Sequence, residues 1–306
     1  MSVTAKIVLW ALLILSIAIL AFATVMVFFM IRPSNKWSLM DLRKRIEERG
    51  VPFDRYLKSC REALTVFSDY GYKIHGFLMM HRENTDKYVI VSHGYTGNRW
   101  EGLAYANIYY DLGYNVYLYD LRNHGENEET FCSMGFFEHM DIIAIAEELR
   151  SRYGEQIKIG LHGVSLGASS SIMALRVWNQ FAFCVSDCGF ADFKELMGHL
   201  AWKWFRLPKI MSVPICWMGW VILHFNFGQI IPREALTVNQ TTPVMFIHGK
   251  EDTFIPPSHA RELYDTAEAY KELHYIEGAE HAESVYKEPE QYRQLIENFL
   301  KHAVLS

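Results

Sequence analysis

Between about residue 62 and the carboxyl end, short apolar runs alternate with segments of helical periodicity, and this alternation limits the folds open to the chain. Two strand-like runs flank a turn at residues 69–71, which predicts an opening hairpin. Strands that alternate with helices form a largely parallel sheet with helices on both faces, so the sequence predicts an α/β fold. Further strands are expected near residues 87–94, 114–120, 157–165, 181–189, 243–250 and 272–278, and helices near 99–112, 137–154, 166–178, 258–269 and 287–302.

One serine follows a predicted strand directly. Ser165 lies between Gly163 and Gly167, where the strand gives way to a helix. A side chain on such a sharp turn projects above the carboxyl ends of the strands, and crowding there requires small residues two places before and after it. The N–H of Leu166, at the helix start, has no intrahelical partner. This stretch therefore predicts a nucleophile with one oxyanion donor beside it.

A nucleophilic serine needs a base, and the base needs a group that orients it. Asp252 and His281 each follow a later predicted strand, in the order serine, acid, histidine that this topology can bring together. The three residue types in this order, each after a strand, are the significant feature, because the chain contains 13 histidines and one alone would mean little. Asp187, which follows the apolar run FAFCVS, is the second candidate for the acid.

Two more loops follow predicted strands. In HGYTGN, residues 93–98, the glycine lets the backbone approach closely, and we expect the Tyr95 N–H to be the second oxyanion donor. In DLRNHGEN, residues 120–127, we interpret the charged side chains mainly as a network that braces the loop. Both loops are therefore expected at the same edge of the sheet as the serine.

Residues 190–240 interrupt the alternation. They are rich in tryptophan, phenylalanine and methionine, and three prolines divide them into short pieces. The pattern predicts an inserted helical cap, and two interpretations stay open: ordinary packing on the sheet, or a cap that shapes an apolar pocket. The candidate pocket residues are Trp202, Trp204, Trp217 and Trp220.

The amino-terminal segment differs from the rest of the chain, because residues 7–31 contain no charged side chain. At about 1.5 Å per residue, a helix of this length can cross a hydrocarbon core of roughly 30 Å. Residues 21–23 look like a signal-peptide cleavage site, but the apolar run continues past them, which favours an uncleaved single-pass anchor in the cell membrane. We expect an anchor at 1–31, a linker with a short amphipathic helix at 32–61, and a catalytic domain at 62–303.

The charges around this segment are unequal. Lys6 alone precedes it, and the positive-inside rule then leans weakly towards a cytoplasmic catalytic domain. The amphipathic helix carries Leu39, Leu42 and Ile46 on one stripe, and it is expected either to dock on the domain or to lie on the membrane. The basic residues after the segment are Arg32, Lys36, Arg43, Lys44 and Arg45.

Bulk properties narrow the class of function. A net charge of -5 without a long basic run argues against nucleic-acid binding. The five cysteines are widely spaced and form no zinc-type cluster, so we expect free, buried thiols and no metal site.

The set HGYTGN, DLRNHG, GVSLG, HGKEDTFIP and GAEHAES resembles the α/β-hydrolase superfamily over roughly residues 62–303. It is most similar to bacterial membrane-anchored serine hydrolases near the esterase and prolyl-oligopeptidase-like branches. The resemblance implies a mostly parallel eight-stranded sheet flanked by helices, with no metal and no organic cofactor. It also implies a Ser165–His281–Asp252 triad with backbone donors at Tyr95 and Leu166.

The predicted function is hydrolysis of carboxylic esters, acyl or aromatic and including lipid-derived ones, through an acyl-enzyme. The expected partners are a small-molecule ester and, through residues 7–31, a lipid bilayer. Peptidase and thioesterase activities use the same machinery and stay open. A non-catalytic, membrane-tethered binding module is the alternative from a different class of function.

Overall fold

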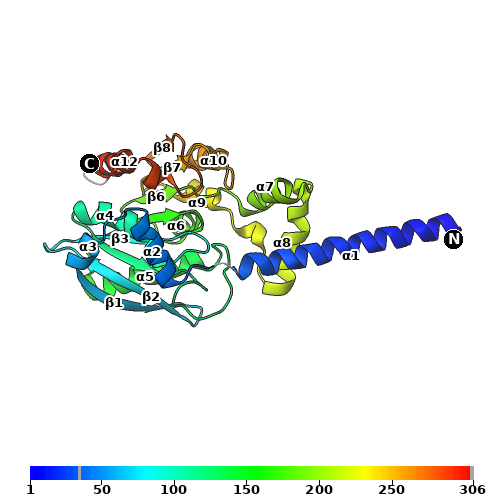
Figure 1. Cartoon of the computed structure of the whole chain (residues 1–306), viewed down its shortest axis with the longest axis horizontal. Helices are drawn as coiled ribbons and strands as arrows, with labels where there is room; N and C mark the ends of the chain where they lie inside the picture. Colours follow the sequence, from blue (N-terminus) through cyan, green and yellow to red (C-terminus); the bar gives the residue numbers. More distant parts are fainter. Residues whose placement is uncertain (34–35, 304–306) are drawn as a thin grey trace.

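The computed structural model describes residues 1–33 and 36–303, and in it one eight-stranded sheet carries helices on both faces (Figure 1). The strand order is β1-β2-β4-β3-β5-β6-β7-β8. β2 runs antiparallel to β1 and to β4, and the other neighbouring pairs are parallel, so the predicted α/β-hydrolase architecture is confirmed. The strands are β1 Cys60–Phe67, β2 Lys73–Met80, β3 Lys87–Ser92, β4 Asn115–Tyr119, β5 Lys158–Val164, β6 Cys184–Asp187, β7 Val244–Gly249 and β8 Lys271–Ile276.

The helices follow the predicted alternation. Two short helices, α3 and α11, lie outside the predicted set, because segments this short show no helical period in a sequence. The helices are α1 Val3–Ile31, α2 Leu39–Glu48, α3 Asp54–Lys58, α4 Leu103–Asp111, α5 Glu138–Tyr153, α6 Leu166–Val177, α7 Phe193–Phe205, α8 Ser212–Leu223, α9 Pro232–Val238, α10 Ser258–Thr266, α11 Ser284–Lys287 and α12 Pro289–Ala303, with short 3₁₀ turns at Arg99–Gly102, Lys209–Met211 and Phe227–Gln229.

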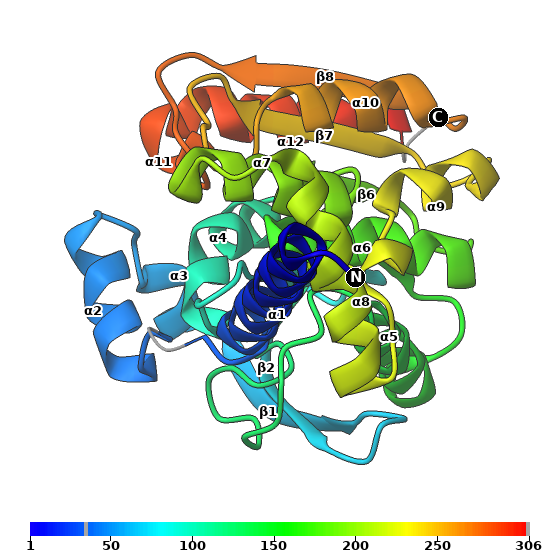
Figure 2. The ribbon, with the colours of Figure 1, turned by 90° about the vertical axis from the view of Figure 1, so that its right-hand side faces the viewer.

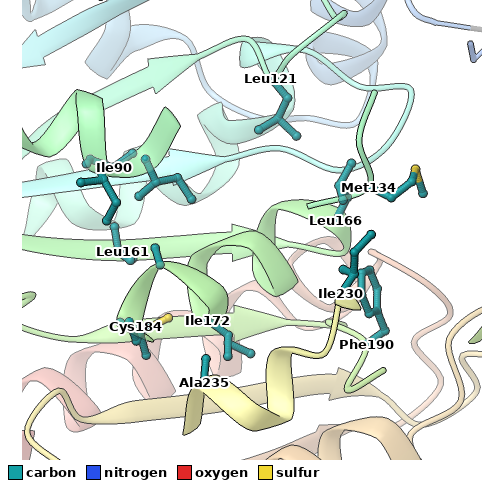
Figure 3. Packing of buried hydrophobic residues seen from close by; sticks show 14 of the residues in the cluster. Ile90, Leu121, Met134, Leu161, Leu166, Ile172, Cys184, Phe190, Ile230 and Ala235 are labelled. Carbon is teal, nitrogen blue, oxygen red and sulfur yellow. The ribbon is translucent and has the colours of Figure 1, made fainter. Parts of the chain in front are cut away.

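The central strands are buried on both faces, which explains their unbroken apolar runs. Ile90 on β3 pairs with Leu161 on β5, and both pack into the core that α6 covers (Figure 3). Val89 and Val91, which point to the other face, pack into a second core beneath α4 and α12. Because β3, β5, β6, β7 and β8 are parallel, their carboxyl ends meet at one edge of the sheet.

The amphipathic helix α2 docks on the domain, which settles one of the open interpretations. Its Leu42 and Ile46 are buried against the second core, and the Ser38 hydroxyl caps its start by accepting from the Asp41 N–H at 3.1 Å. The predicted linker includes residues 34–35, which lie outside the described residues.

The predicted cap divides into two parts. α9 packs against α6 and belongs to the helix layer over the sheet, so the pieces that stand away from the sheet are α7 and α8. α8 packs beside the carboxyl-terminal half of α1, and Phe205 at the end of α7 contacts Phe22 of α1. The other half of α1 projects away from the body (Figures 1 and 2). Only Ala23, Val27 and Ile31 of α1 are buried, which argues against a core helix. Among the described residues, α1 is the single unbroken helix long and apolar enough to cross a membrane.

Candidate active site

Ser165 occupies the sharp turn between β5 and α6. Its φ of 55° is a left-handed conformation that a non-glycine residue adopts at a cost, and its N–H donates to the Asp187 carbonyl at 2.8 Å. A Cβ on Gly163 would lie 2.3 Å from the Gly167 carbonyl oxygen, and one on Gly167 would lie 2.2 Å from that of Ser92. Both glycines are therefore required by the close approach of β3, β5 and α6.

The three predicted site residues come together at the carboxyl edge of the sheet. His281 Nε2 lies 2.9 Å from the Ser165 hydroxyl oxygen, and His281 Nδ1 lies 2.6 Å from Asp252 Oδ2. With the proton on Nδ1, the ring donates to Asp252 and leaves Nε2 to accept from the serine. This arrangement can move the serine proton to the histidine during attack on a carbonyl carbon.

Asp252 is held by more than His281. Its Oδ1 accepts from the N–H groups of Phe254 and Ile255, both at 2.9 Å, and His248 Nε2 lies 3.2 Å from its Oδ2. Burial alone would raise the pKa of Asp252, but the hydrogen bonds from His248 and His281 hold it well below its usual range. The carboxylate is therefore ionised and fixed in orientation. Sequence reasoning missed His248, although its position at the end of β7 was a usable signal.

Among the described residues, Asp187, the second candidate for the acid, makes no hydrogen bond to His281. Its Oδ2 instead accepts from the Tyr292 hydroxyl at 2.9 Å, and its carbonyl supports the Ser165 N–H. Burial raises the pKa of Asp187 to about 6. The structure therefore favours Asp252 as the partner of the histidine.

The two expected oxyanion donors lie on the same pocket as the serine. Tyr95, Ser165 and Leu166 all line it, and Leu166 is the first residue of α6, ahead of the intrahelical hydrogen bonds. The Gly94 N–H, next to Tyr95, donates to Glu101 Oε2 at 2.7 Å. Burial raises the pKa of Glu101, and the Gly94 bond opposes that rise. Glu101, which sequence reasoning did not single out, thus fixes the loop after β3 through the Gly94 N–H.

The loop after β4 braces the loop after β3 through backbone atoms. His124 Nε2 accepts from the Thr96 N–H at 3.2 Å, and His93 Nε2 accepts from the Leu121 N–H at 2.9 Å. Asp120 Oδ1 accepts from the Arg99 N–H at 2.8 Å. These contacts join the loop after β4 to the residues that follow β3. They therefore agree with the interpretation of residues 120–127 as a network that braces the loop.

An apolar pocket opens beside the serine. Its floor is continuous with the core, since Leu166, Met134 and Phe190 belong to both (Figure 3). Its walls come from α7, from the loop after β7 and from the end of α1. Of the four candidate tryptophans only Trp204 lines it; the other three, Trp202, Trp217 and Trp220, are about half exposed on the outside of α7 and α8 and are corrected to surface positions.

One group of side chains has the composition of a metal site. Cys188, Asp252 and His281 place ligand-type atoms within 4.8 Å of one another. Burial, with the nearby Asp187 and Asp252 charges, raises the pKa of the Cys188 thiol well above its usual range, and a protonated thiol is a poor ligand. Both ring nitrogens of His281 are already hydrogen-bonded. These residues therefore fit a triad better than a metal centre.

Comparisons with known proteins show the family to which this fold belongs. The model of the prolyl oligopeptidase family matches residues 101–305, a range that contains Ser165, Asp252 and His281. The chain is 30% identical to the uncharacterized protein YqkD of Bacillus subtilis, over 85% of this chain and 86% of that protein. It is 22% identical to the uncharacterized membrane protein YNL320W of Saccharomyces cerevisiae, over 72% of this chain and 70% of that one.

Among solved structures, the chain is similar to the Pyrococcus furiosus esterase Pf2001. The TM-score is 0.67 at 23% identity, over 82% of this chain and 95% of that one. At 23% identity this similarity supports the fold alone. The match to the family model adds evidence from the sequence. The chain belongs to the prolyl oligopeptidase family, within the α/β-hydrolase superfamily.

Proposed function

We propose that this protein hydrolyses carboxylic esters through an acyl-enzyme, with Ser165 as nucleophile, His281 as general base and acid, and Asp252 as the group that orients the histidine. The single observation that carries the proposal is the hydrogen-bonded relay of 2.9 Å and 2.6 Å from three separate strand ends. A serine in this setting is activated by the base beside it, and the buried carboxylate stabilises the imidazolium that forms.

The steps follow from the positions of the atoms. His281 Nε2 takes the Ser165 proton as the hydroxyl oxygen attacks the ester carbonyl carbon, and the Tyr95 and Leu166 N–H groups stabilise the oxyanion. The histidine then gives the proton to the departing alcohol. Water, activated by the same ring, attacks the acyl-enzyme and releases the acid.

The apolar pocket favours esters over peptides, which are the substrates that the family name suggests. Its lining consists of aromatic, aliphatic and methionine side chains apart from Ser165 and the Tyr95 hydroxyl, so it suits an acyl or aromatic group. Thioesters and peptides share the reaction and are the other outcomes of a substrate panel. We also propose that α1 anchors the protein in a membrane, in keeping with its exposed apolar surface.

The test uses a fluorophosphonate probe, which labels activated serines, on the full chain. We expect labelling in the wild type and none in Ser165→Ala. Ser171→Ala is the matched control, because Ser171 lies on the same helix α6, is buried, and has no hydrogen-bond partner for its hydroxyl among the described residues. Labelling that persists in Ser165→Ala contradicts the proposal, as does a folded wild type that turns over no ester, thioester or peptide of the panel.

A further inference from the structure

One wall of the pocket beside Ser165 comes from outside the hydrolase domain. Phe22, Met26, Phe29 and Met30, on the last turns of α1, line it opposite α7. The membrane-type helix therefore forms part of the cavity in which the substrate lies. A simple tether would leave the cavity complete without it.

The depth of this wall follows from the length of the apolar segment. About 20 residues span the hydrocarbon core of a bilayer. Counted from residue 7, where the uncharged run begins, this places Phe22 and Met26 within the near leaflet and Met30 at its surface. The pocket therefore lies at the level of the acyl chains and headgroups of one leaflet.

The cap carries an apolar surface at the same level. Phe22 of α1 contacts Phe205 of α7 edge to face at 5.5 Å, so the two exposed surfaces are continuous. Tryptophan is typical of the membrane interface, and basic side chains near it favour anionic headgroups; here Arg206 and Lys209 are exposed between α7 and α8. The large exposed apolar side chains of the cap are Trp202, Trp204, Phe205, Ile210, Val213, Trp217, Trp220 and Val221.

The end of α1 is also bonded to the loop that holds the expected oxyanion donor. The Tyr95 hydroxyl donates to the carbonyls of Phe29 and Met30, at 3.2 Å and 2.9 Å. The Ile31 carbonyl accepts from the Cys132 N–H at 2.8 Å. These contacts satisfy carbonyls that a helix end leaves without partners, and they fix α1 relative to Ser165.

We propose that the substrate is an acyl ester of a membrane lipid, whose acyl chain passes from the leaflet into the pocket that α1 and α7 line. This inference rests on the proposed function. The Ser165 oxygen bonds to the acyl carbon as the bond from that carbon to the lipid alcohol breaks, and the alcohol leaves with the proton from His281. Water then releases the fatty acid, so the reaction needs no other reactant.

The experiment uses the full chain in nanodiscs of ether-linked phosphatidylcholine, a lipid without ester bonds. Two substrates are compared: a palmitoyl monoacylglycerol in the disc and a water-soluble butyryl ester. Met26→Trp fills the pocket from α1. Val25→Trp is the matched control, because Val25 is the neighbouring residue and is 64% exposed on the outside of the helix.

For Met26→Trp we expect the rate on the palmitoyl ester to fall by about tenfold or more relative to the rate on the butyryl ester, because the long chain fills more of the pocket that Met26 lines. Val25→Trp should keep both rates. Equal losses on both substrates, or no loss, would overturn the inference. If Met26→Trp takes up no fluorophosphonate, the same comparison is made with Met30→Trp, which obstructs the same wall one turn further on.

Measurements on the wild type distinguish the proposed lipid substrate from the proposed function. Turnover of the butyryl ester without turnover of the palmitoyl ester refutes the lipid substrate and leaves the serine hydrolase in place. Failure to cleave either ester, together with no fluorophosphonate uptake at Ser165, refutes the proposed function itself.

Discussion

The two sides of the pocket are built by different interactions. On the side of the sheet, Ser165, Asp252 and His281 are fixed by hydrogen bonds between 2.6 Å and 2.9 Å, on turns that leave the strand ends. On the side of α1 and α7, the wall consists of aromatic and methionine side chains that make apolar contacts. Polar contacts fix atoms to within tenths of an ångström, whereas apolar contacts fix shape and tolerate exchange. Substitutions on the first side should therefore change the rate of chemistry, and those on the second the choice of substrate.

The largest expected effect tests the polar side. Asp252→Asn should lower kcat by about 10⁴-fold, because an amide favours the wrong histidine tautomer and cannot stabilise its cation. The matched control is Asp187→Asn, which keeps an oxygen to accept from Tyr292 and should lower kcat by less than about tenfold. Steady-state kinetics on a soluble ester measure both. A larger loss in Asp187→Asn would make Asp187 the acid and break the assignment.

The second effect concerns the loop after β3. Glu101→Ala removes the acceptor for the Gly94 N–H and should lower kcat about thirtyfold, the equivalent of roughly 2 kcal/mol. Glu101→Gln keeps an acceptor oxygen and should stay close to the wild type. Equal losses in both variants would show that the charge of Glu101, rather than its hydrogen bond, supports the loop.

The residues of the polar side could be brought together from the sequence further than those of the apolar side, for a physical reason. A nucleophile turn needs glycine at 163 and 167, and parallel strands must end together, so Asp252 and His281 could be placed from local pattern and topology alone. The contact of α1 with α7 joins segments far apart in the chain through side chains with no directional chemistry. Nothing in a tryptophan's own neighbourhood distinguishes Trp204, which lines the pocket, from Trp217, which does not.

The difference between Trp204 and Trp217, which are 46% and 50% exposed, can be measured by substitution. Trp204→Ala removes a pocket wall next to Phe254, which contacts the His281 ring, and should raise KM for an apolar ester about tenfold. Trp217→Ala should leave KM within about twofold, because it removes surface only. Similar effects of the two changes would mean that the cap moves as a unit and that the apolar side has no fixed wall.

The smallest expected effect lies where the two sides meet. Tyr95→Phe keeps the backbone N–H and the ring but removes the hydrogen bonds to the carbonyls of Phe29 and Met30. A hydrogen bond of this kind contributes about 1 kcal/mol, so we expect kcat on a soluble ester to fall only about fivefold. Tyr270→Phe, which loses an exposed hydrogen bond to Glu272, is the control and should not change kcat.

The fall in Tyr95→Phe should be larger for a long-chain ester than for a short one, because the same loss loosens the α1 wall. If both esters respond equally, Tyr95 supports the oxyanion loop alone and α1 is mechanically independent of the triad. If neither responds, the contact between α1 and the loop after β3 is held by the apolar packing of Phe22 and Met26, and the two sides of the pocket act separately.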